Sequence, residues 1–436
     1  MNFWIFTHSM APFDHWIDGH QERFDAWHEA GVRGIVVGYM RFTLPDGSSV
    51  SAWTPDPAVY AAHGETPPEG PRDAEREARL RQMLDSAADR GWQVMIFGAP
   101  MTPATLQDLA NAFPQVSGFI VDGPGENHYE LAFHHGGELF EIRPGEDGLY
   151  RSIGADLDRI GRGITSLRQS FQELTPQRVR YLAPGGTFGG LTLFDVDEDG
   201  LYWLRQRRLA SQHRWQEARD AVDGVDRPMQ LGGIPRTATF SPLTGQDYQL
   251  MAAGPFDLLF PKHYYWHRGF DGLYGTVARW VQRLCRWNAG LTEADALLVV
   301  ENLFGLRLPG VHCLLDLELG FPQEFYDDVV AGETRRALAA VGDDAERLIF
   351  WVSTGRAPHA GDSMTSRDLH GILASARDAG MTRFLFHPDP HLRASEWRVL
   401  SSLCGTPWQE RPGGWFPGGE DPSNRYSGQR QPANED

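Results

Sequence analysis

Short apolar runs alternate with segments of helical periodicity along this chain, and the alternation constrains the fold more than any other feature of the sequence. Each run is rich in β-branched or aromatic residues and ends in glycine or polar residues. Strands that are apolar on both faces and separated by amphipathic helices are typical of a parallel sheet covered by helices. The first four runs are NFWIFTH (2–8), VRGIVVGYMRF (32–42), WQVMIFGAP (92–100) and VSGFIVDGPGE (116–126).

Four further runs have the same character, and a last helix is expected over ASEWRVLSSLC (394–404). Eight strands is the number that closes a (β/α)8 TIM barrel, which is the α/β fold that we expect. An open, doubly wound sheet is the alternative, but no GxGxxG follows the first strand and no GxxxxGK[ST] occurs. The four runs are RPMQLGGIP (227–235), FDLLFPKHYYW (256–266), RLIFWVSTG (347–355) and TRFLFHPDP (382–390).

Two stretches are too long to be simple crossovers and are interpreted as insertions. The first, 134–225, follows the fourth strand and includes one leftover β-rich run, RVRYLAP (178–184). The second, 288–320, follows the sixth strand and is expected to be helix plus loop. We therefore expect one catalytic barrel over 1–407 and a disordered tail, rich in glycine and proline, over 408–436.

Composition narrows the classes of partner. A net charge of −18 argues against nucleic acid and against anionic membranes, and no apolar run is long enough to span a bilayer. The start of the chain lacks the pattern of a secretory signal, and three widely spaced cysteines indicate a reducing cytoplasm without structural zinc. We expect a cytoplasmic protein with a small carbohydrate as its partner, no cofactor, and possible homo-oligomerisation.

Lys262 is the only lysine among 40 basic residues, and it stands in FPKHYYWHRGFDG (260–272). Arginine replaces lysine readily on solvated surfaces, but not where a compact or deprotonatable amine is needed. The retention of this one lysine therefore indicates a functional position, with chance retention as the alternative.

Polar and aromatic residues gather at the predicted strand ends, which meet at one mouth of a barrel. Rings beside hydrogen-bonding groups suit a sugar, whose C–H faces stack on aromatics while its hydroxyls need donors and acceptors. The expected substrate-binding residues are His8, Arg41, His128, Lys262, His263, Tyr265, Trp266, His267, Arg268, Glu318, His387 and Asp389.

Asp122 is the strongest candidate for a catalytic carboxylate, because it follows four mostly apolar residues at the end of the fourth strand. Glycoside hydrolysis needs a second carboxyl group. Glu126, after the turn that follows Asp122, and Asp271 in RGFDG are the expected partners, with Asp316, Glu318 and Glu324 as further candidates. The alternative for Asp122 is a turn cap, a role typical of Asp-Gly.

The histidines also invite a metal interpretation, but no HExxH is present and no spacing is specific, so no metal is expected. Lys262 has two chemical readings. As an ammonium it would bind hydroxyls and hold Asp122 ionised; as a neutral amine it would form a Schiff base with a carbonyl substrate. The acids expected at the mouth favour the ammonium.

The stretch FIVDGPGE (119–126) resembles the fourth strand of α-fucosidase and α-galactosidase type retaining glycoside hydrolases. The resemblance implies that Asp122 is the nucleophile, while the acid/base of those families has no match here. Longer stretches around 260–277 and 318–338 resemble uncharacterised bacterial barrels that are described as glycoside hydrolase-like. We therefore expect a retaining glycoside hydrolase, with a Schiff-base lyase or aldolase using Lys262, or a non-catalytic sugar-binding barrel, as the alternatives.

Overall fold

The structure is a computed structural model of the chain. It describes residues 1–7, 14–44, 48–122, 141–142, 145–267, 272–355, 364–388 and 392–409. The expected tail lies almost wholly outside the described residues. No helix in the described ranges is both long and apolar enough to cross a bilayer.

The core of the fold is an eight-stranded parallel sheet in the order β8-β7-β6-β5-β2-β1-β10-β9. Bridges between Leu259 and Leu348 and between Lys262 and Trp351 join the two edge strands, so the sheet closes into a barrel. Each of the eight predicted runs contains a strand of the sheet, so the barrel is confirmed and the doubly wound alternative is wrong. The strands are β1 (Asn2–Thr7), β2 (Val32–Gly38), β5 (Gln93–Phe97), β6 (Gly118–Asp122), β7 (Gln230–Ile234), β8 (Leu258–Leu259), β9 (Phe350–Ser353) and β10 (Arg383–His387).

Large rings from opposite walls fill the barrel. Trp4 of β1 meets Phe260, just after β8, with ring centroids 6.0 Å apart, although the two strands are far apart in the sheet order. One layer higher, Phe6 lies 5.1 Å from Trp351 of β9. Small residues make room for these rings, because a Cβ on Gly34 of β2 would stand 2.4 Å from the Trp4 indole. The interior is therefore a packed core rather than a pore.

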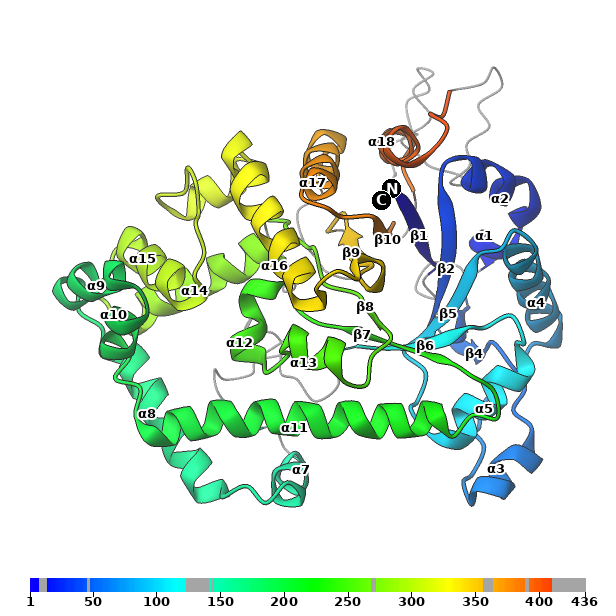
Figure 1. Cartoon of the computed structure of the whole chain (residues 1–436), viewed down its shortest axis with the longest axis horizontal. Coiled ribbons are helices and arrows are strands. Elements are labelled where there is room, and N and C mark those ends of the chain that lie inside the picture. Colours follow the sequence, from blue (N-terminus) through cyan, green and yellow to red (C-terminus); the bar gives the residue numbers. More distant parts are fainter. Residues whose placement is uncertain are drawn as a thin grey trace, which may run out of the picture.

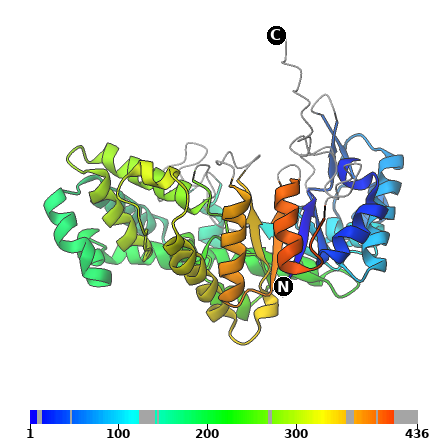
Figure 2. The same ribbon diagram turned by 90° about the horizontal axis from the view of Figure 1, so that it is seen from above.

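Helices that follow the strands pack around the barrel (Figures 1 and 2). Their starts are encoded locally: the side chains of Asp73 and Thr102 accept hydrogen bonds from backbone N–H groups of the first turns of α4 and α5. The predicted last helix is confirmed as α18. These helices are α1 (Asp14–Ile17), α2 (His20–Glu29), α4 (Ala74–Asp89), α5 (Pro103–Ala112), α12 (Ser241–Thr244), α13 (Tyr248–Ala253), α14 (Leu273–Trp287), α16 (Ala331–Val341), α17 (Ser366–Asp378) and α18 (Ala394–Cys404).

The described parts of the two extra segments consist mainly of helices. Figure 1 shows α8, α9 and α10 extending from one side of the barrel, and the long α11 crossing beneath the strands toward α5. The β-rich run 178–184 is not a strand: Thr175 caps α9 and Pro176 occupies its first turn. After β6 come α7 (Asp147–Ser152), α8 (Leu157–Gln172), α9 (Pro176–Leu182), α10 (Gly186–Leu193) and α11 (Glu198–Asp223); after β8 come α15 (Glu293–Phe304) and the 3-10 turn Leu314–Glu318.

The second predicted strand is interrupted. β2 ends at Gly38, and Tyr39 and Met40 have φ angles of 59° and 46°, in the left-handed region that non-glycine residues rarely adopt. The chain then forms a hairpin of β3 (Arg41–Thr43) and β4 (Ser49–Ser51), followed by α3 (Pro57–His63). The run 32–42 is therefore a strand and a sharp turn into a hairpin, not one strand.

Candidate functional site

Asp122 and Lys262 are delivered to the mouth of the barrel by two different strands. Asp122 is the last residue of β6, and Lys262 lies just after β8. The backbone of Lys262 is fixed on both sides: its N–H donates to the carbonyl of Pro235 at 3.1 Å, and its carbonyl accepts from Thr237 Oγ1 at 2.9 Å. The amine is thus placed by the rigid sheet rather than by a free loop.

The two groups form an ion pair, with Lys262 Nζ 3.3 Å from Asp122 Oδ1. The lysine side chain is 5% exposed, whereas the aspartate side chain is 28% exposed. A buried ammonium beside a carboxylate favours the charged form of both partners. The sequence-based expectation that these two groups meet is confirmed, and the pairing favours the ammonium reading of Lys262. The carboxylate keeps a path to solvent, as a group that meets a ligand must.

Tyr39 is a neutral hydrogen-bonding residue near the Asp122–Lys262 ion pair. Burial, together with the nearby Asp122 charge and against the opposing effect of Lys262, raises the pKa of its hydroxyl to about 12. The hydroxyl therefore stays protonated at neutral pH and is able to donate a hydrogen bond. Its ring packs edge-on against Phe97 at 5.1 Å, and the residue remains 43% exposed. The sequence showed Tyr39 only as one ring among several.

An aromatic floor lies beside the ion pair. Trp351 lies 5.5 Å from Phe97 and 5.8 Å from His387, and His387 lies 4.6 Å from Phe6. His387 is the last residue of β10 and is 3% exposed, so it belongs to this floor as a buried ring. The indole N–H of Trp351 and the hydroxyl of Thr354 are buried and have no hydrogen-bond partner in the part of the chain that the structure describes. Two buried donors without a partner are uncommon in native proteins.

Two of the expected substrate-binding residues, His263 and Tyr265, are not brought to the mouth. Successive residues of an extended chain point to opposite faces, so Lys262 turns inward while His263 and Tyr265 turn toward the helices. His263 Nε2 lies 3.0 Å from Thr334 Oγ1 of α16, and burial lowers the pKa of this imidazole to about 3. Tyr265 packs on Phe325 at 5.5 Å. Both are parts of the core rather than binding residues.

Trp266 and His267, which were also expected to bind substrate, pack within the protein. Trp266 is fully buried and stacks on Tyr264 at 4.4 Å, so its face is already covered. His267 packs on Phe321 at 4.6 Å. The remaining predicted residues that are described, Arg41 and Glu318, are exposed on β3 and on the 3-10 turn after α15.

Six of the predicted site residues lie outside the described residues and stay predictions: His8, Glu126, His128, Arg268, Asp271 and Asp389. Within the described ranges, no group of three or more His, Cys, Asp or Glu side chains could hold a metal ion. Cys285, Cys313 and Cys404 are free thiols.

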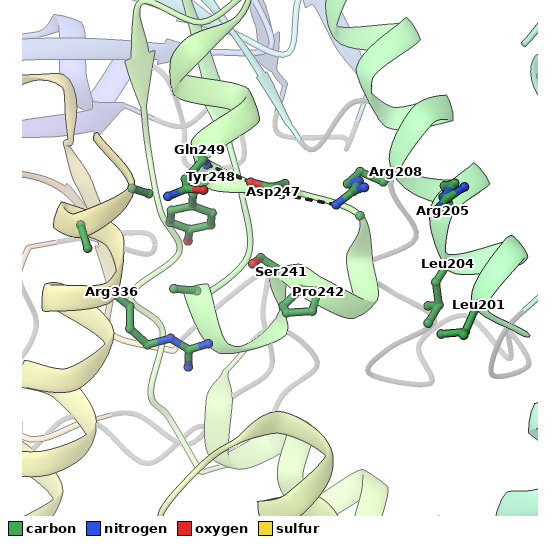
Figure 3. Close-up of a pocket in the computed structure, with 14 residues that line it drawn as sticks. Leu201, Leu204, Arg205, Arg208, Ser241, Pro242, Asp247, Tyr248, Gln249 and Arg336 are labelled. Carbon is green, nitrogen blue, oxygen red and sulfur yellow. Dashed lines mark hydrogen bonds and ion pairs between the residues drawn. The ribbon is translucent and has the colours of Figure 1, made fainter. Parts of the chain in front are cut away.

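Two further cavities are lined by neither Asp122 nor Lys262. One, of about 490 Å³, is lined by α11, the α12–α13 segment and α16, with Arg208 paired to Asp247 at 3.8 Å on its wall (Figure 3). It contains none of the predicted site residues. The other, of about 670 Å³, lies at the ends of β2 and β5 and includes Tyr39 and Arg41 in its lining.

No protein-family model matches the chain, and no curated protein matches it in sequence. Solved structures that resemble it include a β-galactosidase from the psychrophilic Marinomonas ef1, at a TM-score of 0.45 and 11% identity over 93% of this chain; the match spans 59% of that protein's length. A GH5_18 protein from Streptomyces cattleya in complex with GlcNAc has a TM-score of 0.36 and 13% identity, covering 89% of this chain and 70% of that one. A β-glucosidase from Thermotoga maritima in complex with noeuromycin has a TM-score of 0.33 and 8% identity, covering 86% and 77%. At these TM-scores the likenesses carry no argument, and the barrel assignment rests on the strand pairing.

Proposed function

We propose that this chain is a glycoside hydrolase whose reaction takes place at the mouth of the barrel, with Asp122 as its anionic catalytic group. The observation that carries the proposal is the Asp122–Lys262 ion pair, in which a partly exposed carboxylate is held 3.3 Å from a buried ammonium at the ends of two strands. The exposed part of the carboxylate leaves it able to meet a substrate at the barrel mouth, while the ammonium fixes its position.

The chemistry follows from the charge of Asp122. Positive charge grows on the sugar ring in the transition state, so an ionised carboxylate stabilises that state more than it stabilises the bound substrate. In a retaining reaction, the Asp122 oxygen bonds to the anomeric carbon as the bond to the leaving oxygen breaks, and an acid protonates that oxygen. Water then displaces Asp122, and the same acid, now a base, takes its proton. Glu126 and Asp271 remain the predicted acid/base.

Lys262 and Tyr39 are positioning residues in this scheme. The ammonium favours the ionised form of Asp122 at the pH of the reaction. The protonated Tyr39 hydroxyl is close enough to Asp122 and Lys262 for their charges to shift its pKa, and it supplies a donor at the edge of the site. Rings of the aromatic floor, Phe97 and Trp351, lie next to this group and exclude water from one side of it.

The test is a panel of nitrophenyl glycosides and glycosyl fluorides assayed with wild type, Asp122→Asn and Asp122→Ala. We expect a loss in kcat of about 10³-fold or more in both variants, as for removal of a group that stabilises transition-state charge. Azide is expected to restore turnover to Asp122→Ala as a glycosyl azide if the reaction is retaining. Asp158→Asn, at an exposed position on α8, is the matched control and should leave kcat unchanged. Full turnover in Asp122→Asn would refute the proposal.

A Schiff-base lyase is the second candidate, because Lys262 is buried as such lysines are. Borohydride added with an aldehyde or ketone substrate would trap a covalent adduct on Lys262 in a lyase. We expect no adduct by mass spectrometry, because the carboxylate at 3.3 Å opposes loss of the proton. A stoichiometric adduct on Lys262 would favour the lyase over the hydrolase.

A further inference from the structure

The cavity of about 670 Å³ beside the mouth, here named the hairpin cavity, is a second candidate binding site. Its lining includes Tyr39, Arg41, Trp53, Tyr60, Glu65 and Thr66. These residues come from the β2–β3 turn, the hairpin and the segment around α3, which Figure 1 shows beside β5 and α5. The volume falls within the range of pockets that hold small molecules.

Tyr39 connects the hairpin cavity to the barrel mouth. Its side chain lines the cavity, and its N–H donates to the carbonyl of Phe97 at the end of β5, the strand that pairs with β6, at whose end Asp122 lies. The ring also lies directly on Gly98 at the end of β5, where an added Cβ would stand 2.8 Å from Tyr39 Cδ1. Tyr39 thus belongs to the cavity wall at a strand end that only β5 separates from the end of β6, where Asp122 lies.

The polar groups of the cavity wall are mostly turned into the protein. Trp53 Nε1 donates to Asp108 Oδ2 at 2.8 Å, and the Tyr60 hydroxyl donates to Thr105 Oγ1 at 3.4 Å. Glu65 accepts from Thr102 Oγ1 at 2.7 Å. With these donors and acceptors already paired, few free polar groups remain in this wall. The Trp53 and Tyr60 side chains are themselves nearly buried, and the ring of the lining that stays exposed is Tyr39, at 43%.

This chemistry suits a group with few hydroxyls. A sugar that is recognised through its hydroxyls needs many free donors and acceptors, whereas an aryl or other apolar ring needs surface to pack on. Arg41 is the exception, because it is exposed and makes no hydrogen bond or ion pair within the described ranges. One cation at the rim fits a ring that carries a single polar or anionic substituent.

We infer that the hairpin cavity binds the leaving group of the substrate, an apolar or aromatic ring joined to the sugar whose anomeric carbon lies at Asp122. This inference rests on the proposed function. In this arrangement the sugar occupies the mouth over the aromatic floor, and the leaving ring packs against the exposed ring of Tyr39 in the hairpin cavity.

The inference is tested by substituting tryptophan for small residues at the rim of the hairpin cavity, so that the new side chain occupies the cavity. Thr66 is exposed and its side chain makes no hydrogen bond within the described ranges, so Thr66→Trp adds a ring at the cavity without removing a contact. His63→Trp, at an exposed position on α3 that does not line the cavity, is the matched control. Ser49→Trp, from the exposed edge of the hairpin, fills the same space from a second element and guards against misfolding of one variant.

Each variant is assayed with a nitrophenyl glycoside and with the glycosyl fluoride of the same sugar, whose leaving group is too small to reach the cavity. We expect kcat/KM for the nitrophenyl glycoside to fall at least about tenfold in Thr66→Trp and Ser49→Trp, since burial of one ring is worth that much or more. Turnover of the fluoride should stay within about twofold of wild type, as should both substrates in His63→Trp.

The outcomes separate the two proposals. A selective loss for the nitrophenyl substrate supports the leaving-group site. Unchanged or equally reduced turnover of both substrates overturns the leaving-group site and leaves the hydrolase standing. Absence of turnover in wild type overturns both, and a fluorescence titration of wild type and Thr66→Trp with a nitrophenyl thioglycoside then decides whether the cavity binds a ring at all.

Discussion

The coupling free energy of the Asp122–Lys262 ion pair should be larger than that of the shorter but more exposed pair of Arg79 and Asp18. At 3.3 Å, two unit charges attract by about 1 kcal/mol in water and about 5 kcal/mol at an effective dielectric constant near 20. Lys262 is 5% exposed and Asp122 28% exposed, so the pair lies between these limits. We expect a coupling free energy of about 2 kcal/mol at pH 7.

A double-mutant cycle measures this coupling. Wild type, Asp122→Asn, Lys262→Met and the double variant are unfolded in urea, and tryptophan fluorescence and circular dichroism must report coincident transitions for the free energies to be used. Arg79 and Asp18 provide the matched cycle: their side chains are 2.7 Å apart, but they are 32% and 62% exposed. We expect less than about 1 kcal/mol for that surface pair.

The single variants carry a further expectation. Asp122→Asn should destabilise more than Lys262→Met, because it leaves the buried ammonium without its counter-charge, whereas Lys262→Met leaves a carboxylate that solvent reaches. In active Lys262→Met, the acidic limb of kcat/KM should move to higher pH, because the ammonium no longer favours ionised Asp122. A coupling no larger than that of the surface pair, or the reverse order of the two single variants, would refute the reasoning.

Two further changes test the fold around the site. The folded-state pKa of His263 is about 3, below its ordinary value near 6.5, so between these values the unfolded chain binds a proton that the folded chain does not. The free energy of unfolding of the wild type should therefore fall by about 1.4 kcal/mol for each unit by which the pH is lowered in this range. His263→Gln should show a flatter pH dependence in urea unfolding. Gly34→Ala should lower the melting temperature strongly, because its Cβ would stand 2.4 Å from the Trp4 ring, whereas Gly161→Ala, in α8 with nothing within 4 Å, should stabilise by about 0.5–1 kcal/mol. A stable Gly34→Ala protein or an unchanged acid profile in His263→Gln would contradict the packing described above.

The barrel and the meeting of Asp122 with Lys262 followed from patterns that the sequence carries plainly. Buried parallel strands are apolar on both faces, so they stand out as runs between helices, and their carboxyl ends converge whatever their distance in the chain. Asp122 and Lys262 are 140 positions apart in number, yet they meet because both end such runs. The single lysine was a useful signal for a different reason, because an arginine side chain does not fit a buried position that is occupied by a compact ammonium.

The residues after Lys262 were harder to place, because HYYWH has no alternation of polar and apolar positions that would mark two faces. If Lys262 faces the barrel mouth, the alternation of side chains along an extended chain places His263 and Tyr265 on the opposite side, facing the helices. The prediction that the cluster 263–267 contacts substrate did not take this alternation into account. Aromatic composition alone therefore suggested a binding surface where much of the cluster is core.

The turn at Tyr39 and Met40 could not be read from the sequence at all. Neither residue type favours a positive φ, and each such residue costs on the order of 1–3 kcal/mol unless its surroundings hold it. The structure supplies those contacts: the N–H of Tyr39 donates to the carbonyl of Phe97 at 2.7 Å, and Ala52 donates to the carbonyl of Met40 at 2.9 Å. The strained turn leads the chain away from the barrel into the hairpin and places Tyr39 in the lining of the hairpin cavity. Strain retained at the end of a barrel strand is expected where a side chain must hold an unusual position for function, and here one residue contributes to both proposed sites, while Thr66 and Asp122 allow them to be tested apart.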